Sequence, residues 1–267
     1  LGYIPEPLSI STTLEYAYTD WCISQVAQAM GKNEDARYFY EKGQAYHNIF
    51  DKEKGWFRPR KADGSWVAWP ENARLKEWYG CIEANSYQQG WFVPHDVSGM
   101  VELMGGKEKV IEDLIYFFSK TRSNRLWNEY YNHANEPVHF VPFLFNQLAV
   151  PWHTQKWTRY TCEKAYANKV EGIVGNEDVG QMSAYVLAAS GIHPSCPGNT
   201  RMEITSPVFD KVEFALDPAY YSGKKFTVIA HDNSVDNVYI QKALLNGKEY
   251  NKCYLDFTDI VSGGTLE

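Results

Sequence analysis

"STTLEYAYTDWCISQVAQAMGKNEDARYFYEKGQAYHNIFD", residues 11–51, holds two segments of helical periodicity around the short linker Gly31-Lys32. The apolar residues of the first segment follow one another at steps of three to five: Leu14, Tyr18, Ile23, Val26 and Met30. The second segment carries a similar stripe after Asn33: Ala36, Phe39, Tyr40, Gly43 and Tyr46. Such spacing places side chains on one helix face, and Ser, Thr and Asn are typical N-caps. The stretch therefore predicts a hairpin of two antiparallel helices.

Helical periodicity continues to about residue 195 and then gives way to strand periodicity. Turns rich in Gly, Pro or Asn separate five further candidate helices, at about 86–104, 107–121, 135–148, 152–168 and 178–190. From about residue 201, alternating and β-branched runs predict strands, with a hairpin turn at Asn246-Gly247. We therefore expect a mainly α domain over residues 1–200, built from helical hairpins, and a β-rich segment over 201–267.

The composition excludes several classes of protein. Of the 267 residues, 44% are hydrophobic and 22% charged, as in ordinary globular proteins. The net charge of −7 and the lack of a basic run argue against nucleic-acid binding. No stretch of about 18 apolar residues suggests a membrane span. The five cysteines are widely spread without a CxxC pair, which fits neither a zinc site nor a disulfide framework.

Aromatic residues are frequent, at 15% with 9 Trp and 19 Tyr, and flat rings beside polar groups suit sugar faces as well as protein cores. The chain begins LGYIPEPLSI, with neither an initiator Met nor a leader sequence. We therefore expect a fragment or a processed chain.

Polar residues concentrate in GCIEANSYQQGWFVPHDVSGM, residues 80–100, within an otherwise apolar pattern. Pro94 interrupts the predicted helix and places His95 and Asp96 before a new helix start. Each polar residue has a simpler interpretation, with Asp96 as a cap and Glu83 as a solvated acid. The candidates for a functional role in this segment are Glu83, Gln88, Gln89, Trp91, His95 and Asp96.

A second group lies in YNHANEPVHFVPFLFNQ, residues 131–147. Asn135 and Glu136 before Pro137 are compatible with a plain helix N-terminus. That interpretation leaves the crowding of Asn132, His133 and His139 unexplained. Carboxylate and amide oxygens suit a hard cation such as Ca²⁺, whereas the spacing of His133 and His139 is poor for zinc. Asn135 and Glu136 are therefore candidate metal ligands.

The third group, GIVGNEDVGQMSAY at residues 172–185, sets Asn176, Glu177 and Asp178 before an apolar run. The simpler interpretation is a helix cap with a charge that matches the helix dipole. The alternative is catalysis, because hydrolysis of a glycosidic bond needs one protonated and one ionised carboxyl group. Glu83 could supply the second carboxyl group from a different helical hairpin.

Six phrases occur in the order found in one family: TLEYAYTDWCISQVAQAMGK, GWFRPRKADGSW, EANSYQQGWFVPHDVSGM, ANEPVHFVPFLFN, PWHTQ and GNEDVGQMSAYVL. Together they resemble the calcium-dependent α-mannosidases of glycoside hydrolase family 92. The resemblance spans nearly all of residues 3–200. It implies exo-hydrolysis of α-linked mannose with inversion, on an (α/α)6 barrel packed against a β-sandwich. It also implies that Ca²⁺ binds mannose hydroxyls and helps to distort the ring.

The resemblance assigns roles by motif. Glu83 of EAN matches the general acid, which must be held protonated by burial, and Asp178 of GNED matches the general base. Asn135 and Glu136, with Gln88 or Gln89, match polar and calcium-coordinating positions. The candidate substrate-binding residues are Asn176, Glu177, His95, Asp96 and Trp91.

Two departures from the family pattern are visible. The run SYQQGW after Glu83 differs from the expected tryptophan-glutamine-tyrosine-like run, so the wall of the sugar subsite is expected to differ. The chain also resembles only the C-terminal part of family members, so we expect a missing N-terminal β-sandwich and a fragment that is inactive alone.

The implied substrate is an α-mannoside glycan, and the implied location is outside the cytoplasm, secreted, periplasmic or at the cell surface. Two alternatives stay open at this point. One is a non-catalytic helical-hairpin binding module, which the absence of a fixed repeat and the terminal strands disfavour. The other is an (α/α)6 glycosidase that acts on a different sugar.

Overall fold

The structure of the chain is a computed structural model that describes residues 1–121, 128–178 and 180–267. Contacts divide the described residues into two compact units, one up to residue 141 and the other from residue 142 onward. We describe each unit by itself. The domain boundary expected at residue 200 stays a prediction. Within the described ranges, no helix has the length and apolar character that a membrane span requires.

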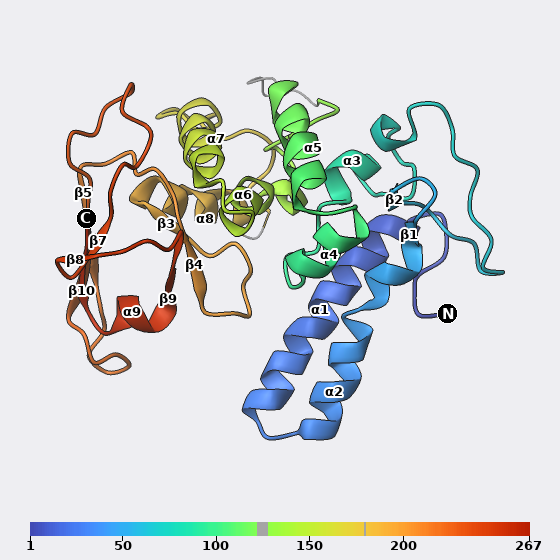
Figure 1. Cartoon of the computed structure of the whole chain (residues 1–267), viewed down its shortest axis with the longest axis horizontal. Helices are drawn as coiled ribbons and strands as arrows, with labels where there is room; N and C mark the ends of the chain where they lie inside the picture. The colour runs from blue at the N-terminus through green and yellow to red at the C-terminus, as the bar shows by residue number, and fades with distance from the viewer. Residues whose placement is uncertain (122–127, 179) are drawn as a thin grey trace. The chain divides into compact units, whose positions relative to one another are not determined.

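The predicted helical hairpin is present in the first unit as α1 (Ser9–Ala29) and α2 (Asn33–Lys42), which lie side by side (Figure 1). The buried face of α1 differs from the expected stripe. Val26 and Met30 are 59% and 65% exposed, whereas the buried apolar residues are Ile10, Leu14, Ala17, Trp21 and Ala27. From Ile10 to Trp21 these residues follow one another at steps of three and four, which is helical spacing, so the helix is correct but its buried face differs from the predicted one.

The first unit contains eight further short elements: η1 (Ala45–Ile49), β1 (Phe50–Asp51), β2 (Trp56–Phe57), η2 (Ala73–Leu75), α3 (Ser86–Gln89), α4 (Val97–Leu103), α5 (Lys107–Ser119) and η3 (Glu136–Val138). The α5 helix confirms the helix predicted at 107–121. The candidate at 86–104 is two helices, because the chain leaves the helical path before Pro94, as its missing N–H group predicts.

The prediction of a continuous helix at 135–148 is wrong. This segment forms only η3, the 3-10 turn η4 (Val141–Phe143) and one turn of helix, α6 (Leu144–Gln147). Pro137 and Pro142 remove two backbone donors in close succession, so a continuous helix would lack two of its hydrogen bonds. The apolar side chains that suggested a helix, such as Phe143 and Phe145, are buried nevertheless.

The second unit combines helices with two small sheets. Its helical elements are α6, α7 (Pro151–Lys164), α8 (Gln181–Ala184), η5 (Tyr185–Ser190) and α9 (Phe257–Val261). Its strands are β3 (Ile192–His193), β4 (Arg201–Ile204), β5 (Lys211–Ala215), β6 (Lys225–Ile229), β7 (Leu244–Leu245), β8 (Lys248–Glu249), β9 (Tyr254–Asp256) and β10 (Gly264–Leu266). α7 confirms the helix predicted at 152–168, whereas the one predicted at 178–190 is a short α-helix followed by a 3-10 helix.

The strands pair in the orders β5-β6-β10-β7-β8 and β3-β4-β9. β7 and β8 form the predicted hairpin, and Asn246 and Gly247 both have positive φ, 53° and 75°. A shared core lies beneath the strands, and its most buried members are Phe226, Leu255 and Ile192. The run expected to be a strand after residue 254 instead turns into α9, because Asp256 and Asp259 form a capping box.

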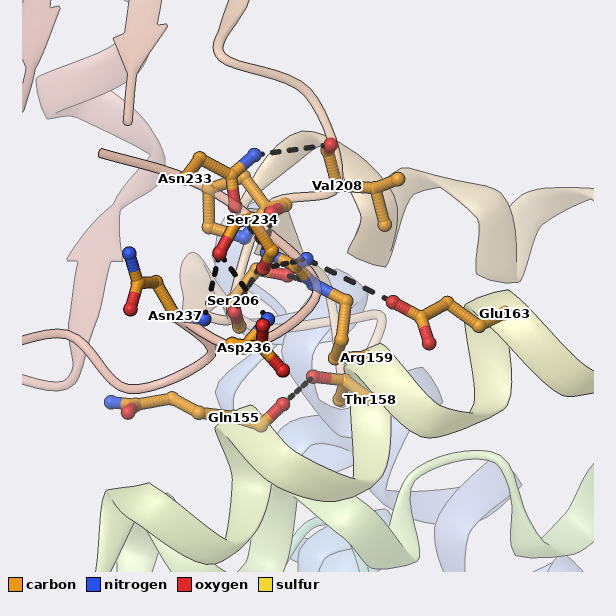
Figure 2. Close-up of polar contacts among 11 residues, drawn as sticks. Gln155, Thr158, Arg159, Glu163, Ser206, Val208, Asn233, Ser234, Asp236 and Asn237 are labelled. Carbon is orange, nitrogen blue, oxygen red and sulfur yellow. Dashed lines mark hydrogen bonds and ion pairs between the residues drawn. The ribbon is translucent and has the colours of Figure 1, made fainter. Parts of the chain in front are cut away.

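Arg159 of α7 joins this helix to two loops of the second unit (Figure 2). Its guanidinium donates to Asn233 Oδ1 at 2.6 Å and to Ser206 Oγ at 3.2 Å. Asn233 in turn donates through Nδ2 to the carbonyl oxygen of Val208 at 3.1 Å. The side chain is 5% exposed, and its charge is compensated by these acceptors rather than by a close ion pair. Arg159 is therefore a structural residue of the second unit.

Candidate active site

Glu83 lies on a loop, residues 78–84, that closes on itself and is bound to the first turn of α1. The backbone N–H of Trp78 donates to the carbonyl oxygen of Ala84 at 3.2 Å. The carbonyl oxygen of Gly80 accepts from the backbone N–H groups of Ile10 and Ser11 at 2.8 and 3.1 Å. These two hydrogen bonds satisfy backbone N–H groups at the start of α1. A Ser or Thr cap was expected to do this, but the N-cap residue is Leu8, whose side chain makes no cap bond.

Glu83 itself has a φ of 48°, in the left-handed region that residues other than glycine rarely adopt. Its side chain is exposed. The burial that the predicted acid role requires is therefore not supplied by the residues of the first unit that the structure describes.

Side-chain amides connect the segment after Glu83 to residues 128–135. Asn85 and Gln88 form a capping box at the start of α3, and Asn85 Nδ2 donates to the carbonyl oxygen of Glu129 at 2.9 Å. Gln88 Nε2 donates to the carbonyl oxygens of Asn128 and Tyr130 at 2.8 and 2.6 Å. Both the oxygen and the nitrogen of the Gln88 amide are thus used in hydrogen bonds within the unit. Gln88 is therefore the least suitable of the four candidate metal ligands.

Gln89 is 1% exposed and its Nε2 donates to Glu15 Oε1 of α1 at 3.1 Å. Burial raises the pKa of the Glu15 carboxyl group, and this hydrogen bond offsets part of the rise. Because the nitrogen of Gln89 faces Glu15, its amide oxygen is directed elsewhere, as a cation ligand would need. The sequence analysis missed Glu15, although an acidic residue between Leu14 and Tyr18 on an apolar helix was a usable signal.

Asn135 and Glu136 lie beside the loop that carries Glu83. Asn135 Nδ2 donates to the backbone carbonyl oxygen of Glu83 at 3.0 Å and makes no cap bond to η3. This orientation leaves the amide oxygen of Asn135 as the acceptor that faces away from Glu83. The side chain of Glu136 is nearly buried, at 9% exposed. The structure therefore brings Asn135 to the backbone of Glu83, with Glu136 next to Asn135 in the chain.

His133 and His139 stack with ring centroids 4.2 Å apart, and the Nε2 atom of His139 lies 3.0 Å from the carbonyl oxygen of His133. Burial lowers the pKa of His139 to about 4, which the bond to His133 only partly opposes. His139 is therefore neutral at pH 7 and adds no positive charge beside Glu136.

These observations bear on whether the residues fit Ca²⁺. Among the residues that the structure describes, no group of three or more His, Cys, Asp or Glu side chains could hold a metal ion. Oxygen atoms of Asn135, Glu136 and Gln89 provide the hard, mixed amide and carboxylate donors that Ca²⁺ accepts. The donor chemistry fits, with one carboxylate rather than an acidic cluster.

His95 and Asp96 are structural in the described unit. The Nε2 atom of His95 lies 2.8 Å from the carbonyl oxygen of Gly43, and its ring packs among Tyr18, Trp21 and Tyr46. Asp96 caps α4 by accepting from the backbone N–H of Gly99 at 2.9 Å, as its simpler interpretation predicted. The substrate contacts proposed for both residues stay predictions that this packing does not favour.

Trp91 is fully buried, 0% exposed, with its ring 5.0 Å from that of Trp56. Tyr87 and Phe117 cover other parts of its indole. Aromatic clusters of this kind are cores, because each ring removes a large apolar area from water. Trp91 thus packs inside the first unit, and its substrate-binding role stays a prediction that this burial does not favour.

The residues around Asp178 belong to the second unit. Glu177 accepts through its two carboxylate oxygens from Ser183 N at 3.1 Å and Ser183 Oγ at 2.8 Å, and so binds the first turn of α8. Asn176 and Asp178 are exposed, and Asp178 has a φ of 34°, left-handed like that of Glu83. The structure separates the tasks of the two adjacent carboxylates: Glu177 stabilises the turn, while Asp178 is available to a ligand.

A cavity of about 620 Å³ in the second unit contains none of the predicted site residues. Arg159, Val228, Leu244 and Leu266 are among the residues that line it. Its size is within the usual range for ligand pockets, and its lining includes the acidic residues Asp232, Asp236 and Glu267, none of which belongs to the motifs that match the family's catalytic positions. The polar residues of the two loops are therefore the better site candidates.

Comparisons with known proteins identify the family of the chain. The whole chain, residues 1–267, matches the family model of the glycosyl hydrolase family 92 catalytic domain. A family 92 α-mannosidase of Bacteroides thetaiotaomicron superposes with a TM-score of 0.90 at 34% identity, over 99% of this chain and 35% of that chain. A family 92 inverting mannosidase of the same organism gives a TM-score of 0.86 at 36% identity, over 100% of this chain and 38% of the other.

An uncharacterized secreted glycosidase of Arthroderma benhamiae is 30% identical over 97% of this chain and 35% of its own length. The chain thus spans only about a third of the relatives that it matches. The structural matches establish the predicted fold class, which is mainly α and part of an (α/α)6 barrel with strands toward the C-terminus. On the evidence of its full-length match to the family model, this chain belongs to glycoside hydrolase family 92 and forms part of its catalytic domain.

Proposed function

We propose that this chain carries both catalytic carboxylates of an inverting, calcium-dependent exo-α-mannosidase, with Glu83 as general acid and Asp178 as general base. The observation that carries the proposal is the hydrogen bond from Asn135 to the backbone of Glu83, which joins the acid to the loop of oxygen ligands. The names of two structural neighbours, an α-mannosidase and an inverting mannosidase, support the choice of sugar and of stereochemistry. The first of these enzymes was also solved with mannoimidazole bound.

In this mechanism, Glu83 donates its proton to the glycosidic oxygen as the bond from that oxygen to the anomeric carbon breaks. Asp178 takes a proton from a water molecule, and the water oxygen attacks the anomeric carbon from the opposite face. The two carboxyl groups of an inverting enzyme stand about 6.5–9.5 Å apart to leave room for this water. The product is the β-anomer of mannose.

Asn135, Glu136 and Gln89 would hold the calcium ion. When bound there, Ca²⁺ would supply an electrostatic hold on the hydroxyl groups of mannose and favour a distorted ring. The role of the protein is to keep these donors in place, through the bonds of Asn135 to Glu83 and of Gln89 to Glu15.

The natural substrate in this proposal is an α-mannoside glycan that the whole enzyme meets outside the cytoplasm, which the secreted relative supports. The chain alone is proposed to be inactive. In support, the relatives are about three times longer, and Glu83 is exposed rather than buried.

The test compares two variants of the whole enzyme, Glu83→Gln and Asp178→Asn. Removal of a general acid or base should lower kcat for an α-mannobiose by about 10²–10⁴-fold. Glu177→Gln is the matched control, since the Glu177 carboxylate accepts hydrogen bonds from Ser183 at the start of α8, and the variant should retain most of the activity. Proton NMR of the first product formed should detect β-mannose. Near-normal turnover of either catalytic variant, or release of α-mannose, would contradict the proposal.

A further inference from the structure

Trp78 stands out on the loop of residues 78–84 because it is both exposed and in an uncommon backbone conformation. Its side chain is 59% exposed, and its φ is 61°. A bulky residue with positive φ is an outlier. The neighbouring Tyr79 is buried, with its hydroxyl group donating to the carbonyl oxygen of Ala68 at 2.8 Å. The chain thus turns Tyr79 inward and Trp78 outward at consecutive positions.

The conformation of Trp78 is maintained by the bonds that close the loop. Its N–H donates to the carbonyl oxygen of Ala84 at 3.2 Å, and its own carbonyl oxygen accepts from Gly80 at 3.0 Å. Trp78 therefore lies at the base of the same closed loop from which Glu83 extends, beside the backbone of the residue that follows Glu83. Strained backbone of this kind persists only where its surroundings hold it, and it concentrates at ligand sites.

The rest of the first unit leaves the loop no room to relax. A Cβ atom on Gly80 would lie 2.5 Å from Pro59 Cγ and 3.0 Å from Ile10 Cγ1. The carbonyl oxygen of Gly80 is bound by two N–H groups of α1, and the N–H of Ile82 donates to Ser11 Oγ at 3.2 Å. These contacts hold the backbone of the loop that carries both Trp78 and Glu83, and groups that act on one ligand need such a support.

The indole of Trp78 is available for such a ligand. In the ranges that the structure describes, its ring takes part in none of the aromatic or cation contacts that connect the other tryptophans of this unit, such as Trp56 and Trp66. Ile82 on the same loop is also 44% exposed. A large apolar surface left in water beside a candidate acid has no role in the packing of this unit.

We propose that Trp78 is the stacking platform for the leaving-group sugar of the substrate. This inference rests on the proposed function, in which Glu83 protonates the oxygen that joins mannose to that sugar. A group on the loop of the acid therefore faces the leaving-group side of the bond. The C–H face of a pyranose ring buries apolar area against an indole. The assignment makes Trp78 a specificity-determining residue for saccharide, rather than small, leaving groups.

The test uses two substrates that differ only in the leaving group, an α-mannobiose that the whole wild-type enzyme cleaves and α-mannosyl fluoride. Trp78→Gly removes the ring, and glycine accepts a φ of 61° without strain, so the loop should keep its shape. We expect kcat/KM to fall about ten- to hundredfold for the mannobiose, the loss of one buried aromatic contact. The value for the fluoride should change less than about twofold. Trp78→Phe should recover most of the mannobiose activity.

Trp152→Ala is the matched control, because Trp152 is 49% exposed on α7 and lies outside the loop. It should leave the ratio of the two kcat/KM values unchanged. An equal fall for both substrates in Trp78→Gly, or no fall for the mannobiose, overturns the role of Trp78. Glu83→Gln separates this result from the proposed function. It should abolish mannobiose cleavage and largely spare the fluoride, whose leaving group needs no acid, whatever Trp78 does.

Discussion

The side-chain nitrogen of Asn135 donates a hydrogen bond to the backbone carbonyl oxygen of Glu83 at 3.0 Å. These residues come from segments that are far apart in the sequence, and the bond fixes both the loop of the candidate acid and the direction of the Asn135 amide. Because the nitrogen donates to Glu83, the proposed calcium site would use the amide oxygen of Asn135. Occupation of the proposed calcium site and the position of the acid should therefore depend on one another.

Calcium removal tests this dependence. We expect a chelator to abolish mannose release by the whole enzyme and added Ca²⁺ to restore it. Asn135→Ala should weaken calcium binding, measured by isothermal titration of the chelated enzyme, because it removes one oxygen ligand. Ser98→Ala, outside this site, is the control. Activity that is indifferent to the chelator would remove the metal from the mechanism.

Gly80→Ala should destabilise the first unit strongly. Gly80 has a φ of 75°, and a Cβ atom there would meet Pro59 Cγ at 2.5 Å. We expect a loss of about 2–4 kcal/mol and a lower melting temperature of the whole enzyme. Gly64→Ala is a matched control, because Gly64 has a φ of 87° with nothing within 4 Å of a Cβ atom. It carries the backbone strain alone, about 1 kcal/mol. Equal melting temperatures for the two variants would show that the contact with Pro59 is unimportant.

Glu177→Ala should affect stability more than chemistry. The carboxylate of Glu177 accepts from the N–H and the hydroxyl group of Ser183, which stabilises the start of α8. Its removal should lower the free energy of unfolding by about 1 kcal/mol. Thermal scans and turnover of the same preparation would check both parts. A loss of activity as large as that of Asp178→Asn, without a change in melting temperature, would reverse the roles assigned to these neighbours.

Asp96 should make a stability contribution that depends on pH. Burial alone would raise its pKa, but hydrogen bonds from Tyr46, Gly99 and Ser98 outweigh burial and hold the pKa below its usual value. A depressed pKa in the folded state means that ionised Asp96 stabilises the fold above the unfolded-state pKa of about 3.9. This contribution is lost as the pH falls through the folded-state value.

Asp96→Asn should therefore lower the urea midpoint of the whole enzyme at pH 7. The difference from the wild type should vanish well below about pH 4, where both side chains are neutral. Asp63→Asn is a useful comparison, since Asp63 is exposed and accepts from the N–H and the hydroxyl group of Ser65. If the difference in urea midpoint between Asp96→Asn and the wild type were the same at pH 7 and well below about pH 4, the charge of Asp96 would not be the cause. The effect would then come from its packing or its hydrogen bonds.

Local patterns were sufficient for the elements whose hydrogen bonds lie within the element itself. The helices α1, α5 and α7 follow from the spacing of their apolar residues, and the β7–β8 hairpin follows from Asn246-Gly247. The same patterns failed at 135–148, where two prolines outweighed an apolar run, and after residue 254, where a capping box turned a strand into a helix. In both cases the deciding signal was present in the sequence as backbone chemistry rather than as periodicity.

The sequence by itself determined the order of helices before strands, the family, and the residues that match its catalytic and ligand positions. Only the tertiary structure decided what each polar residue does. It buried Trp91 in an aromatic core, used Asp96 and Glu177 as caps, and left Trp78 and Glu83 on a loop that α1 holds. These outcomes depend on partners such as Gly80 for Ile10 and Asn135 for Glu83. Such partners are remote in the chain, and a local pattern carries no information about which groups folding will bring within hydrogen-bond distance.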